Sequence, residues 1–254
     1  MNLLSFHTVF ILNENIRWLE EFIEYYLTIG FDHFYLYHNE GTIGDVTQQG
    51  NSNMNKYGMP IKTSSSSQDI EKLNNILEKY GSYITYVKWQ PVDKSGNIIY
   101  GQELAIKDVI ARFGHETKWI ACMDLDEYLF SPSNIDIRNY LCQLDSSISD
   151  MKLSQKKFKD RHISAKTKIL EEYECINENF GDWWAGKHIF RPTDFIDLTD
   201  VHSMVFKNKA ISINSNILRF NHYNVNNRQL NWMARAFGKS YRLDGIDTGM
   251  KRYT

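Results

Sequence analysis

Two carboxylates separated by one residue follow a short apolar run near the middle of the chain. The run at 119–123 (WIACM) leads directly into Asp124, Leu125, Asp126 and Glu127. A run of this kind predicts a buried strand, and acids directly after it lie at the carboxyl edge of a sheet, where open α/β folds bind ligands. Two such acids can share a hard divalent cation and the phosphate oxygens that it bridges. The motif therefore predicts a metal-assisted transfer from a phosphorylated donor; the alternative is a pair of solvated loop acids.

Composition limits the classes of partner. The chain has 254 residues, a formal charge of −2 and a pI near 6.4, which favours neither nucleic acid nor an anionic membrane as the main partner. Three widely spaced cysteines predict neither a disulfide framework nor a thiolate zinc site. The apolar segment at 1–12 is too short to span a bilayer and has no basic leader, so we expect no transmembrane segment and a cytoplasmic protein.

The elements that must position the acids alternate along the first half of the chain. Strands are predicted at 5–12, 31–39 and 83–89, and helices from Asn13 or Asn15 to Gly30, at 70–81 and at 101–113. This order predicts an α/β fold with a mostly parallel central sheet. The Gly- and Ser-rich segment at 40–67 is expected to be a flexible insert.

The second half has a different pattern. A short helix is predicted at 137–144, strands near 187–190 and 217–222, and a polar helix at 227–238. The basic stretch at 151–168 is interpreted as a solvated face, or as a lip that attracts an anionic substrate. No internal repeat or Pro-rich linker divides the chain, so one domain is expected over 1–254, either alone or as part of a longer multidomain protein.

The assembled motifs resemble a known family. The segment FILNENIRWLEEFIEYYLTIGFDHFYLYHN at 10–39 is similar to the opening of GT-A glycosyltransferases of the family 92 and family 2-like type. DLDEYL at 124–129 is similar to their DxDEF/Y signature, and GKHIFRP at 186–192 resembles a later segment. Val201-His202-Ser203 and Asn221-His222-Tyr223 resemble two more landmarks in the family's order.

The resemblance implies a single GT-A domain, with a nucleotide-sugar-binding half at 1–130 and an acceptor-side half at 131–254. It implies a hexosyl- or deoxyhexosyltransferase that moves a sugar from a nucleotide-diphosphate sugar to a hydroxyl acceptor, such as a glycan. The sequence departs from the family after the His222-Tyr223 pair and in the basic stretch. Both departures lie on the acceptor side, so the resemblance does not identify the acceptor.

The metal site is expected to combine the paired acids with one histidine. Asp126 is the expected direct ligand, and Asp124 would hold ribose hydroxyls or a metal-bound water. The resemblance suggests His222 as the ligand from the second half, with His202 a weaker candidate; a hydrogen-bonded structural histidine is the alternative for each. Mn²⁺ or Mg²⁺ suits such an oxygen-rich site. Glu127 should face away from Asp126 and orient neighbouring loops.

The donor is expected to contact residues from several elements. Asn39 ends the second strand beside the expected base and ribose pocket, and the resemblance adds Asn13 and Gln102. Lys187 and Arg191 could neutralise the leaving diphosphate; ordinary surface positions are the alternative.

An inverting transfer needs a carboxylate that takes the proton of the acceptor hydroxyl. Asp160 and Asp182 are the candidates, and they remain unranked. Trp183 and Trp184 follow Asp182 and offer flat faces to a sugar ring, although a core role suits them equally well.

Two other functions use similar parts. A nucleotidyltransferase would usually carry a Gly-rich phosphate loop after the first strand, where this chain has Asn13, Glu14 and Asn15. A non-catalytic nucleotide- or sugar-binding module would retain metal-dependent affinity for nucleotides without hydrolysing a donor.

Overall fold

The computed structural model describes residues 1–42, 64–158, 168–176, 186–223 and 245–254. The first half contains β1 (Asn2–Phe10), α1 (Leu12–Thr28), β2 (His33–His38), α2 (Ser67–Tyr80), β3 (Ile84–Lys88), α3 (Gln102–Phe113), β4 (Thr117–Cys122) and β5 (Glu127–Phe130). The second half contains α4 (Ile137–Gln143), β6 (Ile148–Leu153), β7 (Gln155–Phe158), α5 (Ile169–Glu172), β8 (Cys175–Ile176), β9 (Lys187–Phe190), β10 (Phe195–Asp200), β11 (Ser203–Phe206), β12 (Lys209–Ser212), β13 (Arg219–Tyr223), β14 (Gly245–Ile246) and a 3₁₀ helix at Gly249–Tyr253.

The predicted alternation of strands and helices up to the acids is confirmed, and it builds a large, mostly parallel sheet. Its strand order within the described residues is β12-β6-β9-β4-β1-β2-β3. Neighbouring strands run parallel except on both sides of β9, which runs against β4 and β6. The carboxyl ends of β1, β2 and β4 therefore meet at one edge, and the paired acids follow β4 at that edge.

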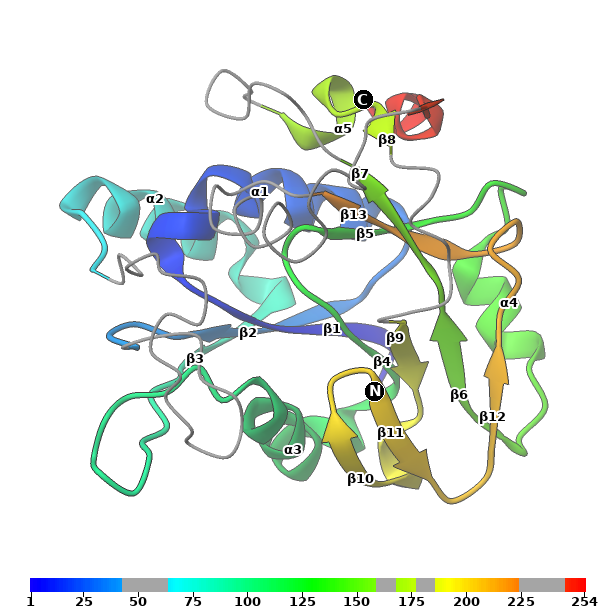
Figure 1. Ribbon diagram of the computed structural model, residues 1–254, viewed down its shortest axis with the longest axis horizontal. Coiled ribbons are helices and arrows are strands. Elements are labelled where there is room, and N and C mark those ends of the chain that lie inside the picture. The colour runs from blue at the N-terminus through cyan, green and yellow to red at the C-terminus, as the bar shows by residue number, and fades with distance from the viewer. Residues whose placement is uncertain (43–63, 159–167, 177–185, 224–244) are drawn as a thin grey trace.

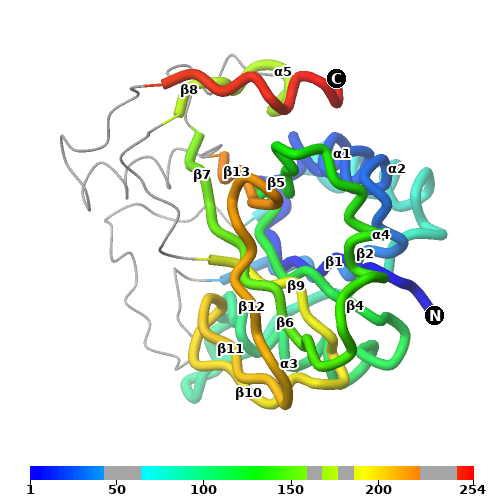
Figure 2. Tube along the Cα trace, turned by 90° about the vertical axis from the view of Figure 1, so that its right-hand side faces the viewer, coloured from blue at the N-terminus to red at the C-terminus, as the bar shows by residue number. Residues whose placement is uncertain are grey.

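The sheet has a packed core on each face. Alternate side chains of β2 point to opposite sides, so Phe34 and Leu36 join the core with α1, α2 and α4. Tyr35 and Tyr37 join a second core with α3 and the β10–β11 hairpin. Figure 1 shows α1 and α2 on one side of the sheet and α3, β10 and β11 on the other, and the turned view agrees (Figure 2).

A second sheet lies on the α1 side and carries the strand that follows the acids. Its order within the described residues is β14-β8-β7-β13-β5, so β5 is an edge strand and β13 lies between β5 and β7. The Tyr128 ring of β5 packs against Phe22 and Tyr25 of α1, which places this sheet beside that helix (Figures 1 and 2).

The basic stretch is only partly a solvated face in its described part, 151–158. Met151, Leu153 and Lys157 of β6 and β7 are buried, whereas Lys152 and Lys156 on the other side are half-exposed. Alternation places positions 151, 153, 155 and 157 on the inward side. The run of lysines concealed this pattern, because Lys157 continues the inward phase while Lys152 and Lys156 point the other way.

The first helix also begins differently from the prediction. Its N-cap is Ile11 rather than Asn13 or Asn15, and Asn15 Oδ1 instead accepts a hydrogen bond of 3.2 Å from the Ile11 amide. The helix ends before Gly30 as expected. Gly30 has a φ of +97°, and a Cβ atom there would lie 2.7 Å from Arg138 Cδ, so a side chain fits neither the backbone nor the space.

Three predicted segments lie partly or wholly outside the described residues: the flexible insert (43–63 of it), the polar helix at 227–238, and the basic residues after 158. The division into donor and acceptor halves of one domain stays a prediction.

Candidate active site

The carboxylate of Asp124 is held from two sides at the carboxyl edge of the large sheet. Gln102 Nε2, in the first turn of α3, donates to Asp124 Oδ1 (2.5 Å), and Lys187 Nζ, at the start of β9, donates to Asp124 Oδ2 (2.8 Å). Burial alone would raise the pKa of the Asp124 carboxyl, but the Lys187 ammonium outweighs burial and lowers that pKa. Three segments distant in sequence thus meet at the first acid of the motif.

Glu127 closes the turn between β4 and β5. Its amide donates to the Asp124 carbonyl oxygen (3.1 Å), and its Oε2 accepts a hydrogen bond of 2.9 Å from the Asp124 amide. Lys187 Nζ lies 3.2 Å from the same Oε2. Burial raises the pKa of Glu127 to about 7, although Lys187 opposes that shift. The carboxylate of Glu127 therefore orders the turn from which Asp124 and Asp126 project.

Lys187 is a buried cation between two carboxylates, with 2% of its side chain exposed. Burial opposes its charge, but Asp124 and Glu127 raise its pKa above the usual value. The preceding Gly186 allows the strand to start there, because a Cβ atom would lie 2.7 Å from the Leu153 carbonyl oxygen. Lys187 therefore fixes the two acids in place, and very little of it faces solvent.

Asp126 and His222 face each other across the pairing of β5 with β13. The register places His222 opposite Glu127, and the Tyr223 amide donates to the Asp126 carbonyl oxygen (2.7 Å). His222 Nε2 lies 3.5 Å from Asp126 Oδ2 and has no hydrogen-bond partner among the described residues. Two atoms suited to a cation are thus brought together from positions 96 residues apart in sequence.

Lys157 of β7 belongs to the same group, although its sequence position predicted only a member of the basic stretch. It pairs in register with His222 and is 2% exposed. Burial lowers its pKa to about 8, although Glu127 and Asp126 oppose that shift. The sequence feature that could have indicated the burial of Lys157 is the alternation of inward positions that starts at Met151 and Leu153.

Arg191 does not join this cluster. Because β9 runs against β4, Arg191 follows the end of β9 toward the opposite edge of the sheet from Lys187. Its guanidinium donates to the Ile148 carbonyl oxygen (2.9 Å) and lies over the Trp119 ring. We therefore leave Arg191 out of the donor site.

The remaining donor-side candidates lie at the ends of β1 and β2. Asn39 is fully buried; its Nδ2 donates to the carbonyl oxygens of Trp89 (3.0 Å) and Ile99 (2.9 Å). Asn13 lies in the first turn of α1, and its Nδ2 donates to the Ser64 carbonyl oxygen (3.3 Å). Asn39 thus ties together the segments that border this edge of the sheet.

His202 contacts the backbone next to Lys187 and does not join the Asp126–His222 pair. Its Nδ1 faces the Gly186 carbonyl oxygen (3.0 Å), and its own carbonyl oxygen faces His188 Nε2 (3.1 Å). Burial lowers the pKa of His202 to about 4, so its ring is neutral at physiological pH.

A comparison with models of protein families identifies the family of this chain. The model of glycosyltransferase family 92 matches residues 60–251, about three quarters of the chain. The chain belongs to glycosyltransferase family 92. This membership confirms the predicted resemblance to family 92.

Solved structures similar to this family 92 member are distant. S. aureus TarS (residues 1–349) shares 12% identity at a TM-score of 0.44, over 87% of this chain and 60% of that one. The chain thus spans about three fifths of the TarS structure. HddC from Yersinia pseudotuberculosis shares 10% identity at a TM-score of 0.39, with both chains fully covered. A search of curated proteins finds no match.

The site of this family 92 member offers few protein ligands to a metal. Within the described ranges, no group of three or more His, Cys, Asp and Glu residues is arranged to hold an ion. Asp126 and His222 form a pair that could supply two ligands to a divalent cation, whose coordination water or phosphate oxygens would complete.

The candidate bases Asp160 and Asp182, with Trp183 and Trp184, lie outside the described residues, as does the 224–228 segment that departs from the family pattern. In the part of the chain that the structure describes, no helix is long and apolar enough to cross a membrane.

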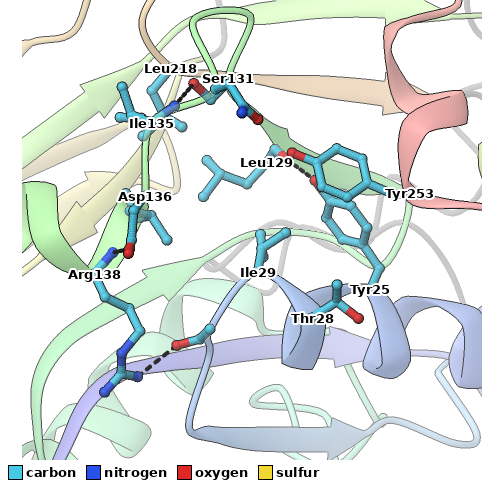
Figure 3. Close-up of a pocket in the computed structure, with 13 residues that line it drawn as sticks. Tyr25, Thr28, Ile29, Leu129, Ser131, Ile135, Asp136, Arg138, Leu218 and Tyr253 are labelled. Carbon is cyan, nitrogen blue, oxygen red and sulfur yellow. Dashed lines mark hydrogen bonds between the residues drawn. The ribbon is translucent and has the colours of Figure 1, made fainter.

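A pocket of about 380 Å³ lies away from the acids, at the other end of β5. Figure 3 shows Leu129 between Tyr25 of α1 and Ile29, just past the end of α1, with the Tyr25 hydroxyl bonded to the Leu129 carbonyl oxygen. The pocket contains none of the predicted site residues.

Proposed function

We propose that this family 92 member transfers a sugar from a nucleotide-diphosphate donor to a hydroxyl acceptor, with a divalent cation bound by Asp126 and His222. The observation that supports this most directly is the pair of facing atoms, Asp126 Oδ2 and His222 Nε2. The histidine nitrogen is buried and has no hydrogen-bond partner among the described residues. A buried polar atom without a partner destabilises the fold, and a bound cation would supply the missing interaction.

The spacing of this pair suits a shared cation. Ligand atoms about 2.1 Å from one octahedral ion lie roughly 3 Å apart, so a separation of 3.5 Å needs only a small adjustment. A bound Mn²⁺ or Mg²⁺ would stabilise the negative charge that develops on the leaving diphosphate.

The surrounding residues position these groups. Lys187 and Gln102 hold both oxygens of Asp124, so its carboxylate is oriented before a substrate arrives. It can then accept hydrogen bonds from ribose hydroxyls or from a metal-bound water. Such preorganised polar groups cost little reorganisation during the reaction.

The donor contacts are proposed to extend from Asp124 to Asn39 and Asn13 along the carboxyl edge. Asn39 Oδ1 is buried and has no hydrogen-bond partner within the described ranges. An inverting reaction would use Asp160 or Asp182 as the base that removes the proton of the acceptor hydroxyl.

The test is a panel of UDP-, GDP-, TDP- and CMP-sugars with and without Mn²⁺, followed by thermal shift and nucleotide release. We expect one donor to give a metal-dependent shift and slow hydrolysis, both lost in Asp126→Ala. The matched control is Glu71→Ala, an exposed acid on α2, which should behave as the native chain.

The same panel separates the alternatives. Metal-dependent nucleotide binding without hydrolysis, even with a range of acceptors, would indicate a binding module. A response that is independent of metal and unchanged in Asp126→Ala would contradict the proposed site.

A further inference from the structure

The His222 ring has two different environments at its two nitrogens. Nδ1 lies 3.3 Å from Gln155 Oε1 and 3.7 Å from Glu127 Oε1. Nε2 lies 3.5 Å from Asp126 Oδ2 and has no hydrogen-bond partner among the described residues. A neutral imidazole carries its hydrogen on only one nitrogen, so these neighbours decide which nitrogen keeps a lone pair.

The two oxygens beside Nδ1 both accept hydrogen bonds, which favours a hydrogen on Nδ1. That tautomer leaves the lone pair on Nε2, directed toward Asp126. Metal-binding histidines generally donate their other ring N–H to a carboxylate, carbonyl or water, which fixes tautomer and ring orientation.

Of the two acceptors, Gln155 Oε1 is the closer to Nδ1, at 3.3 Å against 3.7 Å for Glu127 Oε1. The Glu127 carboxylate already bonds the Asp124 amide and pairs with Lys187. Gln155 is 1% exposed and begins β7, which pairs with β13 so that Gln155 aligns with Phe220. Its carboxamide therefore has little freedom to leave the ring.

We infer that Gln155 is a positioning residue for cation binding: its amide oxygen accepts the His222 Nδ1–H and directs the Nε2 lone pair toward Asp126. This inference rests on the cation site proposed above and adds the residue that prepares it. The opposite orientation of the amide would present its NH₂ group to Nδ1, place the hydrogen on Nε2 and disable that nitrogen as a ligand.

The first experiment measures Mn²⁺ binding to the full chain without any donor, by electron paramagnetic resonance titration. Gln155→Met keeps the side-chain length but removes the acceptor, and we expect its Mn²⁺ affinity to fall about 10- to 100-fold. Gln155→Glu retains an acceptor oxygen and should bind within a few-fold of the native chain. Gln143→Met, on α4 and away from the site, is the matched control.

The second experiment reads the tautomer directly from the ¹⁵N chemical shifts of the His222 ring in the metal-free protein, assigned with His222→Gln. The native ring should show hydrogen on Nδ1, and Gln155→Met should lose that preference while its circular dichroism stays native. Hydrogen on Nε2 in the native chain would overturn the inference.

The outcomes distinguish this inference from the proposed function. If the native chain binds no Mn²⁺, the cation site fails and the inference fails with it. If the native chain binds Mn²⁺ and Gln155→Met binds it equally well with an unchanged ring, the site stands and Gln155 has no positioning role.

Discussion

The hydroxyl of Tyr26 donates a hydrogen bond of 2.8 Å to the carbonyl oxygen of Glu127, in the turn that carries the paired acids. The same hydroxyl accepts a bond of 2.9 Å from the Leu129 amide. Because β5 is an edge strand among the described residues, no strand in that part of the chain pairs with these backbone groups. Tyr25, the preceding residue, bonds the Leu129 carbonyl oxygen (Figure 3). Two adjacent tyrosines of α1 thus complete the free edge of β5 and fix the strand that follows the acids.

Removing the Tyr26 hydroxyl should destabilise the protein. Tyr26→Phe leaves the Glu127 carbonyl and the Leu129 amide buried without this partner, so we expect a loss of about 1–3 kcal/mol in the free energy of unfolding. Urea denaturation followed by circular dichroism measures it. Tyr83→Phe, at an exposed position, is the control; equal stability of the two variants would contradict the edge-completing role.

Removing the Lys187 ammonium should be more costly. Lys187→Met leaves Asp124 and Glu127 as adjacent acids with their shared cation gone, and breaking a buried pair in this way costs about 3–5 kcal/mol. Adding Glu127→Gln removes one of the two acids, so the double variant should recover part of the loss. If chemical denaturation shows the double variant to be less stable than Lys187→Met alone, the charge argument is wrong.

Asp247 should confer stability that depends on pH. Its Oδ2 accepts hydrogen bonds from Lys156 Nζ (3.0 Å) and Arg219 Nη2 (2.7 Å), and its Oδ1 accepts one from the Gly249 amide (2.9 Å). Burial alone would raise the pKa of this carboxyl, but these partners lower it below its usual value. A pKa lowered by folding stabilises the native state above the unfolded pKa, and this contribution disappears as pH falls through the folded pKa.

Asp247→Asn should therefore lose about 1–2 kcal/mol at neutral pH, a modest value because the carboxylate keeps some contact with solvent and the amide retains part of the hydrogen bonding. The difference from the native chain should shrink below about pH 4. Unfolding curves at pH 7, 5 and 3.5 measure this, with Glu71→Gln on α2 as an exposed control. A difference that grows on acidification would reverse the assigned sign.

The cysteines should differ sharply in reactivity. Cys122 is buried in β4, and burial raises the pKa of its thiol, whereas Cys142 on α4 is exposed. A disulfide reagent acts on the thiolate, so Cys142 should react promptly in the native protein and Cys122 only after unfolding. Cys142→Ser should remove one promptly reacting thiol and leave any reaction of the half-exposed Cys175 unchanged. Modification of native Cys122 at the rate of Cys142 would contradict the buried position of that strand.

Local patterns in the sequence were sufficient for the alternating strands and helices of the first half. Apolar runs and helical periodicity arise from contacts within each element, so β1, α1, β2, α2, β3, α3 and β4 could be predicted without knowing their neighbours. The position of the acids followed, because residues after a parallel strand lie at its carboxyl edge. The start of α1 was missed, since the backbone of Ile11 caps the helix without the polar side chain that the prediction relied on.

Tertiary structure alone decided which distant residues meet the acids. Lys187 and Arg191 lie four positions apart and have similar charge, yet the antiparallel direction of β9 brings Lys187 to Asp124 and carries Arg191 toward the opposite edge. Lys157 and Gln155 reach His222 because β7 pairs with β13 in one particular register. Strand direction and register are determined by packing across the whole sheet, and a shift of one residue would turn every side chain to the other face. The sequence by itself thus determined the fold class and the acidic motif, whereas long-range pairing determined the partners of that motif.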